Sequence, residues 1–338
     1  MSFDWHSYAL LGISLMQFEQ VQYAPSNVDL TLVINHYSRV SLNITRELNS
    51  YYIRPRITIY TETHIIIMPG KVIIVTGASR GLGQAIAKLI IEKDKASKVV
   101  LAARSKQLLE KFPELFPESQ RNDVKERTLV VAGDLTRAST VKRLVRETVE
   151  KFGRINSVIC NAGVLDPVGH IADIDVENLR KLFDINFFSI VQLLQEAIPQ
   201  LRKSAEESGA ASSCLFVSSG ASLGSYDGWM AYGTSKAAVN HVALDVSVEE
   251  SPLIRSASVA PGVVDTDMQD YIRNVAGAHM KPEALKRFTD LHENHQLLPP
   301  QVPGSVYANL ALRGVPDSLN GKYVRYSDSS VAEYLDRD

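Results

Sequence analysis

Cysteine is scarce in this chain of 338 residues, where Cys160 and Cys214 are the only two. Both lie in short apolar runs that predict buried strands, and their spacing does not indicate a metal site. The eight histidines do not follow the compact spacing of a zinc site either. We therefore predict no metal, and we expect a cytoplasmic protein because two buried thiols favour a reducing compartment.

The sequence also lacks an excess of charge and a long hydrophobic run. Its net charge of −2 provides no basic field for nucleic acid or an acidic membrane surface. The apolar stretch near the N-terminus, residues 8–16, is far shorter than the roughly 20 residues needed to span a bilayer. We expect a small-molecule substrate and no nucleic-acid or membrane partner.

The chain divides into two unequal parts. Residues 1–67 contain β-branched runs but no turn signals that would connect them, and we interpret them as an N-terminal extension that is poorly ordered or dispensable. Met68 opens a short polar lead into a first apolar strand. Residues 68–338 show no repeat and no linker, so we predict that they form a single domain.

Within that domain, short apolar runs alternate with longer amphipathic stretches. This alternation predicts an α/β fold of the Rossmann type, a doubly wound and mainly parallel seven-stranded sheet with helices on both faces. The predicted strands are residues 72–76, 98–102, 128–132, 157–161, 214–218, 255–259 and 322–325. The predicted helices are residues 81–92, 139–152, 175–201, 229–249 and 303–313.

A glycine-bearing turn joins the first strand of the domain to its first helix, in the sequence TGASRGLG. In this context Gly77 permits the tight turn, Gly81 lets the backbone approach a pyrophosphate, and Gly83 lets the helix pack on the strand. The N–H groups at the start of the helix can then bind an anion. A plain turn with incidental glycines is the alternative.

The end of the second strand indicates which dinucleotide binds. NAD enzymes place a carboxylate there for the ribose 2′-hydroxyl, whereas this chain has Arg104 and Ser105. Arg80, inside the glycine turn, can reach the same position, and arginine favours a 2′-phosphate. We predict NADP(H), the alternative being that Arg104 is a solvated charge at the strand end.

Tyr232 and Lys236 stand four residues apart and face the same side of the predicted helix 229–249. Reduction of a carbonyl needs a proton for the developing alkoxide, and a phenol of pKa near 10 is a poor partner at neutral pH. We expect the Lys236 charge, helped by the oxidised nicotinamide, to lower the phenol pKa; a shift of about three units takes about 4 kcal/mol. A surface pair is the alternative on spacing alone.

These motifs occur in the order typical of one family, and residues 70–326 resemble the classical short-chain dehydrogenases/reductases. The matching segments are TGASRGLG, GDLT, Asn161-Ala162-Gly163, DINFFS, Ser219, the Tyr232/Lys236 pair and Pro261-Gly262 with Thr266. The resemblance implies a set of cofactor-binding residues: Gly77, Ser79, Arg80, Gly81, Leu82, Gly83, Arg104, Ser105, Asp134, Leu135, Asn161, Ala162, Gly163, Tyr232, Lys236, Pro261, Gly262, Val264 and Thr266.

The resemblance also implies the catalytic residues Asn186, Ser219, Tyr232 and Lys236. Ser219 would hydrogen-bond the substrate oxygen, and Ser218 points to the other face of its strand. Asn186 would interrupt its helix and complete a proton relay from Lys236, a plain helix-surface role being the alternative. Asp265 and Asp267 are expected to cap the next helix and take no part in catalysis.

Three segments resemble the sepiapterin reductases and, more closely, the fungal benzil reductase of this family: GVLDPVGHIADIDVENLRKLFDINFFSIVQLL, GWMAYGTSKAA and APGVVDTDMQ. Both kinds of enzyme reduce vicinal dicarbonyl groups with NADPH. The resemblance makes residues 265–298 the substrate lid. Where sepiapterin reductases carry an acid that anchors the pterin, this chain has Arg325, which cannot accept N–H donors. An NADPH-dependent reductase of α-diketones such as benzil is therefore expected. The alternatives are a reductase of another carbonyl, such as a pterin or acyl ketone, and a cofactor-binding regulatory protein.

Members of the family often dimerise through the two long helices that we predict at residues 175–201 and 229–249. A homodimer is therefore possible.

Overall fold

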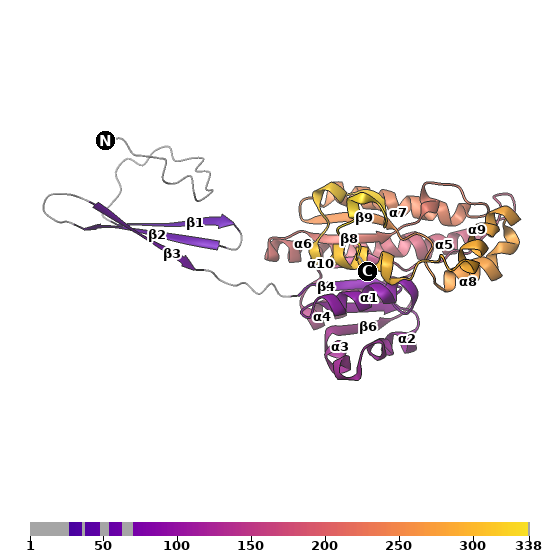
Figure 1. The fold of residues 1–338 in the computed structure, drawn as a ribbon, viewed down its shortest axis with the longest axis horizontal. Coiled ribbons are helices and arrows are strands. Elements are labelled where there is room, and N and C mark those ends of the chain that lie inside the picture. Colours follow the sequence, from indigo (N-terminus) through magenta and orange to yellow (C-terminus); the bar gives the residue numbers. More distant parts are fainter. Residues whose placement is uncertain (1–26, 36–37, 48–53, 63–69, 337–338) are drawn as a thin grey trace. The chain divides into compact units, whose positions relative to one another are not determined.

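The computed structural model describes residues 27–35, 38–47, 54–62 and 70–336 (Figure 1). The chain divides into two compact units, Met1–Met68 and Pro69–Asp338. None of the helices in the described part of the chain is long and apolar enough to cross a membrane.

The first unit contains a three-stranded antiparallel sheet in the order β1-β2-β3. Its β-branched runs therefore form strands, although the sequence indicated no turns between them. The registers pair Asn27 with Thr45 and Arg39 with Glu62. Whether the domain needs this extension stays a prediction. The strands are β1 (Asn27–Asn35), β2 (Ser38–Glu47) and β3 (Arg54–Glu62).

The second unit is built on a seven-stranded sheet in the order β10-β9-β8-β7-β4-β5-β6, in which every pairing is parallel. This confirms the predicted α/β Rossmann-type fold, and each of the seven predicted strands is present. The strands are β4 (Val72–Thr76), β5 (Lys98–Ala103), β6 (Thr128–Ala132), β7 (Ser157–Cys160), β8 (Ser212–Val217), β9 (Ile254–Ala260) and β10 (Lys322–Arg325).

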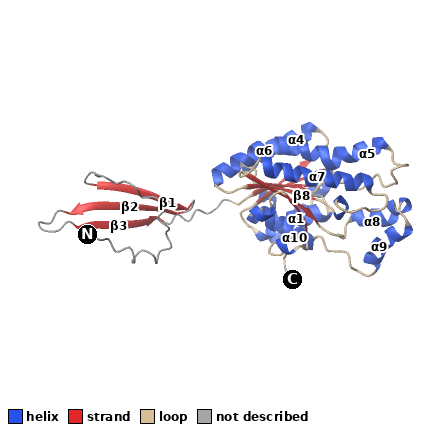
Figure 2. Cartoon of the chain, turned by 90° about the horizontal axis from the view of Figure 1, so that it is seen from above, coloured by secondary structure: helices blue, strands red, loops and turns tan. Residues whose placement is uncertain are grey.

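Helices cover both faces of the sheet (Figure 2). Alternate residues of β4 point to opposite faces: Ile73 and Val75 join the core beneath α1 and α10, while Val72 and Ile74 join the core beneath α4, α6 and α7. The helices are α1 (Gly81–Lys93), α2 (Lys106–Glu110), α3 (Arg121–Arg127), α4 (Ala138–Phe152), α5 (Val176–Phe183), α6 (Ser189–Ser208), α7 (Met230–Glu249), α8 (Asp267–Asn274), α9 (Pro282–Glu293) and α10 (Gln301–Arg313).

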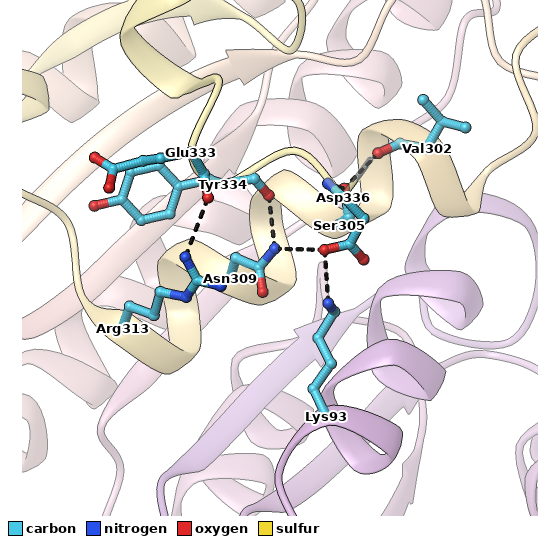
Figure 3. A network of polar contacts seen from close by, with 8 residues as sticks. All are labelled: Lys93, Val302, Ser305, Asn309, Arg313, Glu333, Tyr334 and Asp336. Atoms are coloured by element: carbon cyan, nitrogen blue, oxygen red, sulfur yellow. Dashed lines mark hydrogen bonds and ion pairs between the residues drawn. The ribbon is translucent and has the colours of Figure 1, made fainter. Parts of the chain in front are cut away.

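The C-terminal segment is tied to α10 and α1 by a polar network (Figure 3). Asn309 donates to the Tyr334 carbonyl at 2.7 Å, and its side chain also reaches the Asp336 carboxylate at 3.1 Å. Lys93 of α1 pairs with the same carboxylate at 2.7 Å. Arg313 donates to the Glu333 carbonyl at 3.1 Å. These contacts hold the chain after β10 against the helices that cover one face of the sheet.

Candidate active site

The predicted site residues follow the carboxyl ends of the parallel strands. Strand order reverses at β4, which pairs with β5 on one side and β7 on the other. In such sheets the crevice outside this reversal is where nucleotides bind. The glycine turn follows β4, Asn161 follows β7, and Ser219 follows β8, so the topology gathers segments that are distant in sequence.

The glycine turn after β4 has the shape that a dinucleotide requires. Gly81 adopts a left-handed conformation with φ of +55°, and a Cβ there would lie 3.1 Å from the Thr266 Cγ2. A Cβ on Gly83 would lie 2.4 Å from the Asn161 side-chain nitrogen, so α1 packs directly on the loop after β7. The turn leads into the N-terminus of α1, whose first N–H groups have no partner within a helix. These residues fit a bound pyrophosphate.

Thr76, at the end of β4, holds the Asn161-Ala162 turn in place. Its hydroxyl accepts hydrogen bonds from the backbone N–H groups of Asn161 at 2.9 Å and Ala162 at 3.0 Å. The Asn161 side chain donates to the Thr76 carbonyl at 2.8 Å. Thr76 was not among the predicted site residues, although a hydroxyl residue at the end of the strand before the glycine turn could have indicated this role.

Arg104 and Ser105 lie exposed after β5, close to the residues that follow β6. The backbone hydrogen bond from Thr136 lowers the pKa of Asp134, and the positive charge of Arg104 lowers it further. Asp134 and Leu135 thus stand beside the end of the neighbouring strand, as expected for residues around an adenosine. The structure thus brings Arg104 and Ser105 close to Asp134 and Leu135, the residues predicted to bind the adenosine part of the cofactor.

Arg80 is engaged by a partner that the sequence analysis did not foresee. Its guanidinium pairs with the Asp267 carboxylate at 2.5 Å, and both side chains are largely exposed. Asp267 is the first residue of α8, and Thr266 occupies the N-cap without a capping hydrogen bond from a side chain. The expectation that Asp267 caps this helix was therefore wrong; its carboxylate binds the glycine turn instead.

Ser219, Tyr232 and Lys236 form a cluster at the start of α7. A hydrogen bond links Ser219 to the Tyr232 phenol. The Lys236 ammonium lies 5.7 Å from the centre of the Tyr232 ring and donates to the Val217 carbonyl at 2.7 Å. Tyr232 and Lys236 are both buried, at 7% and 3% exposure, so they are not a surface pair. Ser218 instead bonds Asn240 at 2.6 Å.

Burial sets the protonation of this cluster. It raises the pKa of Tyr232 to about 12, against the opposing effect of the Ser219 hydrogen bond. Burial also lowers the pKa of Lys236 to about 8. The expectation of a phenol pKa lowered by the lysine does not hold for this structure, because desolvation of the phenolate dominates. At neutral pH the phenol is protonated and the lysine is mostly charged.

Asn186 lies in a π-helical turn, Asp184–Phe188, that separates α5 from α6. Its side chain is fully buried; it accepts from the Val164 N–H at 2.8 Å and donates to Ser235 of α7 at 3.1 Å. A Cβ on Gly163 would lie 3.3 Å from the Asn186 oxygen and 3.5 Å from the Lys236 ammonium. Asn186 and Lys236 thus flank Gly163, and Asn186 is not a helix-surface residue.

The segment predicted as a lid begins and ends at one short pairing. Val264 forms an isolated parallel bridge with Leu298, and the Asp265 N–H donates to the Leu298 carbonyl at 2.9 Å. Pro261 and Gly262 connect β9 to this bridge. Between the two paired ends lie α8, a short 3₁₀ turn and α9. The bridge fixes the base of the segment next to Thr266 and the glycine turn.

An aromatic cluster extends from Tyr232 toward α9. Trp229 packs edge-on against Tyr232 with ring centres 5.7 Å apart, and it stacks on Tyr226 at 5.1 Å and on Phe288 at 5.3 Å. The Trp229 indole also donates to the Met280 sulfur. Sequence reasoning did not identify this cluster, because Phe288 is far from Trp229 along the chain.

A buried phenol, a hydroxyl and an ammonium beside a dinucleotide cradle define a nicotinamide-dependent oxidoreductase. The chain belongs to the short-chain dehydrogenase family, whose sequence profile matches residues 71–276.

Relatives of known sequence and structure agree with this assignment. The uncharacterized oxidoreductase YIR035C of Saccharomyces cerevisiae is 45% identical over 267 residues, which cover 79% of this chain and 99% of the relative. Its crystal structure superposes with a TM-score of 0.73, covering 79% of this chain and all of that one. The benzil reductase ((S)-benzoin forming) IRC24 of the same yeast is 43% identical over 268 residues, 78% of this chain and 98% of the relative. The KRED1-Pglu enzyme, whose crystal structure superposes with a TM-score of 0.69, is 55% identical in sequence. The match covers 75% of this chain and all of that one.

Proposed function

We propose that the protein is an NADPH-dependent carbonyl reductase that converts α-diketones such as benzil to α-hydroxy ketones. The observation that carries the proposal is the buried cluster of Ser219, Tyr232 and Lys236, whose phenol, hydroxyl and ammonium can bind and protonate a carbonyl oxygen. The 43% identity to a benzil reductase supports the same substrate class.

When bound, the nicotinamide cofactor supplies the hydride. The Ser219 and Tyr232 hydroxyl groups hydrogen-bond the substrate oxygen and align the carbonyl. Tyr232, which is protonated at neutral pH, gives its proton to the oxygen as negative charge develops there. The Lys236 ammonium stabilises the phenolate that remains, and Asn186, held between Val164 and Ser235, positions the groups around Lys236 for return of the proton.

The exposed charges after β5 support a preference for NADPH. Arg104 follows the end of β5, where dinucleotide enzymes bind the adenosine ribose, and its charge acts on Asp134, so it is our candidate for binding a 2′-phosphate. Arg80 is a second candidate, provided that the phosphate displaces its pairing with Asp267. Ser79, Leu82 and the other turn residues offer backbone N–H groups to the pyrophosphate.

Arg325 supports a diketone over a pterin. It lines a cavity beside the loop that follows Ser219. A guanidinium has five N–H donors and no acceptor, so it cannot pair with the N–H groups of a pterin ring. A neutral diketone makes no such demand.

The experiment compares NADPH oxidation by the purified protein with benzil, diacetyl and sepiapterin under identical conditions. We expect fast turnover of benzil and weak turnover of sepiapterin, and Tyr232→Phe should abolish reduction while NADPH binding, measured by fluorescence, stays nearly intact. Preference for sepiapterin would favour the pterin alternative. Activity of Tyr232→Phe within about tenfold of wild type would contradict the role given to the phenol.

We also propose residues 265–298 as the substrate lid, a cytoplasmic location and a homodimer. The location rests on the two cysteines, which are buried free thiols. The homodimer rests on exposed apolar side chains beside and on the two long helices, Phe188 at 50%, Leu244 at 47% and Val248 at 73% exposure. Light scattering would reveal the mass of a dimer, which Leu244→Lys with Val248→Lys should reduce to that of a monomer.

A further inference from the structure

A cavity of about 470 Å³ opens beside residues 219–227, here called the catalytic loop, which face α9 and the end of β10. Gly220 and Tyr226 line it from the loop, Glu283 and Arg287 from α9, and Arg325 from β10. Because Gly220 directly follows Ser219, a substrate bound at Ser219 can extend one substituent into this cavity. Its charged lining differs from the apolar aromatic cluster on the other side of Tyr226.

Arg287 is held against the loop by a tyrosine. Its guanidinium donates to the Tyr226 hydroxyl at 3.2 Å and lies 5.6 Å from the centre of that ring. The same hydroxyl lies so close to Gly220 that a Cβ there would be 3.4 Å from it. Arg287 is thus connected to the catalytic loop through one phenol.

Arg325 lines the cavity from the end of β10. Tyr323 lies two residues earlier on the same strand, so the two side chains point to the same face of the sheet. The Tyr323 hydroxyl in turn donates to the Ser219 carbonyl at 3.4 Å. Arg287, through its bond to Tyr226, and Arg325, beside Tyr323, thus line one cavity next to Ser219 and Gly220.

Two carboxylates near this cavity are bound by other groups than the arginine side chains. Asp227 accepts from the Lys281 N–H at 2.5 Å and contacts His170 at 3.2 Å, and Asp328 accepts from the backbone N–H of Arg325 at 2.7 Å. Within residues 70–336, neither Arg287 nor Arg325 forms an ion pair with a carboxylate, and the Arg287 guanidinium is bound to the Tyr226 hydroxyl. Glu283 lies one helical turn before Arg287 and lines the same cavity, so its carboxylate can compete for the charge of Arg287.

We propose that this cavity is an anion subsite, and that the substrate is a vicinal dicarbonyl compound carrying a carboxylate on the substituent remote from the reduced carbonyl. The inference rests on the proposed function and extends it to a substrate class. Guanidinium groups bind carboxylates through paired N–H donors, and two of them converging on one cavity provide specificity for such a group.

The experiment measures kcat/KM for benzil, 4-carboxybenzil and its methyl ester, which has nearly the same shape without the charge. We expect wild type to prefer the acid over the ester by about tenfold. Arg287→Met and Arg325→Met should each bring this ratio toward one. Glu283→Gln, which removes the competing carboxylate, should raise it.

The possible outcomes separate the two proposals. Failure to reduce benzil at all would contradict the proposed function. Reduction of benzil with an acid-to-ester ratio near one in wild type would overturn the anion subsite alone, as would a preference for the acid that both arginine variants retain. Should an arginine variant fail to fold by circular dichroism, the wild-type ratio and its response to Glu283→Gln still decide the question.

Discussion

At the scale of single residues, burial acts in opposite directions on the two ionisable groups of the cluster. The pKa of Tyr232 rises to about 12, so the phenol keeps its proton throughout the ordinary pH range. The pKa of Lys236 falls to about 8, so the ammonium form is present below this pH and lost above it. The lysine, and not the tyrosine, should therefore limit reduction at high pH.

We predict that kcat/KM for benzil reduction is constant near neutrality and declines above pH about 8, because a neutral Lys236 no longer stabilises the phenolate. The profile is measured at constant ionic strength, with circular dichroism at each pH as a control for unfolding. A flat profile far above this pH would show that the charge of Lys236 is not required.

If Arg80 binds the 2′-phosphate of NADP(H), as proposed, then Asp267 competes with the cofactor for its guanidinium. Both side chains are exposed, 66% and 63%, and such pairs contribute about 0–1 kcal/mol. Asp267→Asn should thus tighten NADP⁺ binding by a small factor, about twofold to fivefold, with little effect on NAD⁺. Calorimetric titration of both dinucleotides measures it. Asp265→Asn is the matched control, and equal tightening of both dinucleotides would contradict the explanation.

At the scale of elements, the predicted helix 175–201 shows what periodicity can and cannot reveal. Its start was nearly right: Asp175 is the N-cap of α5 and accepts from the Glu177 N–H. The resemblance implied the interruption of the helix at Asn186, but periodicity did not show it, because one extra residue in a helical turn barely changes the apolar spacing. The bonds of Asn186 to Val164 and Ser235 come from other parts of the chain.

The same distinction applies to the site. Ser219, Tyr232 and Lys236 lie close together in the sequence, and the glycine turn precedes them in a fixed order. The sequence alone could therefore predict these site residues. The Arg80–Asp267 pair and the stacking of Trp229 on Phe288 join residues that are distant in sequence. Their contacts depend on how α8 and α9 fold back over the site, which no local pattern encodes.

The C-terminal network gives a prediction for α10. Asn309 is 3% exposed, and its side chain satisfies the Tyr334 carbonyl. Asn309→Ala leaves buried polar groups without a partner and should lower the free energy of unfolding by about 1–3 kcal/mol. Urea denaturation measures the change.

Asn294→Ala is the matched control, because Asn294 makes a similar bond to the Asp290 carbonyl at 2.8 Å from an exposed position. It should change stability by no more than about 0.5 kcal/mol. Equal losses for the two variants would show that burial of the network is not what matters.

At the scale of the whole molecule, the two units differ in what they contain. The seven-stranded sheet, the helices that cover it and the candidate site all lie within Pro69–Asp338. The yeast oxidoreductase YIR035C is covered over 99% of its length by 79% of this chain, so that relative has no counterpart of the extension. The family profile likewise begins at residue 71.

We therefore predict that removal of residues 1–67 leaves the fold and the activity intact. Among residues 70–336, the apolar core on both faces of the sheet begins at residue 72, so the deletion keeps all of these buried side chains. The measurement is the thermal midpoint and kcat/KM for benzil, compared with the full chain. A deletion of residues 1–77 is the control; it also removes β4, the strand at which strand order reverses, and should unfold the domain. A soluble, active product of the shorter deletion and an insoluble product of the longer one would place the boundary between them. Loss of fold or activity on removal of residues 1–67 would instead show that the extension belongs to the domain.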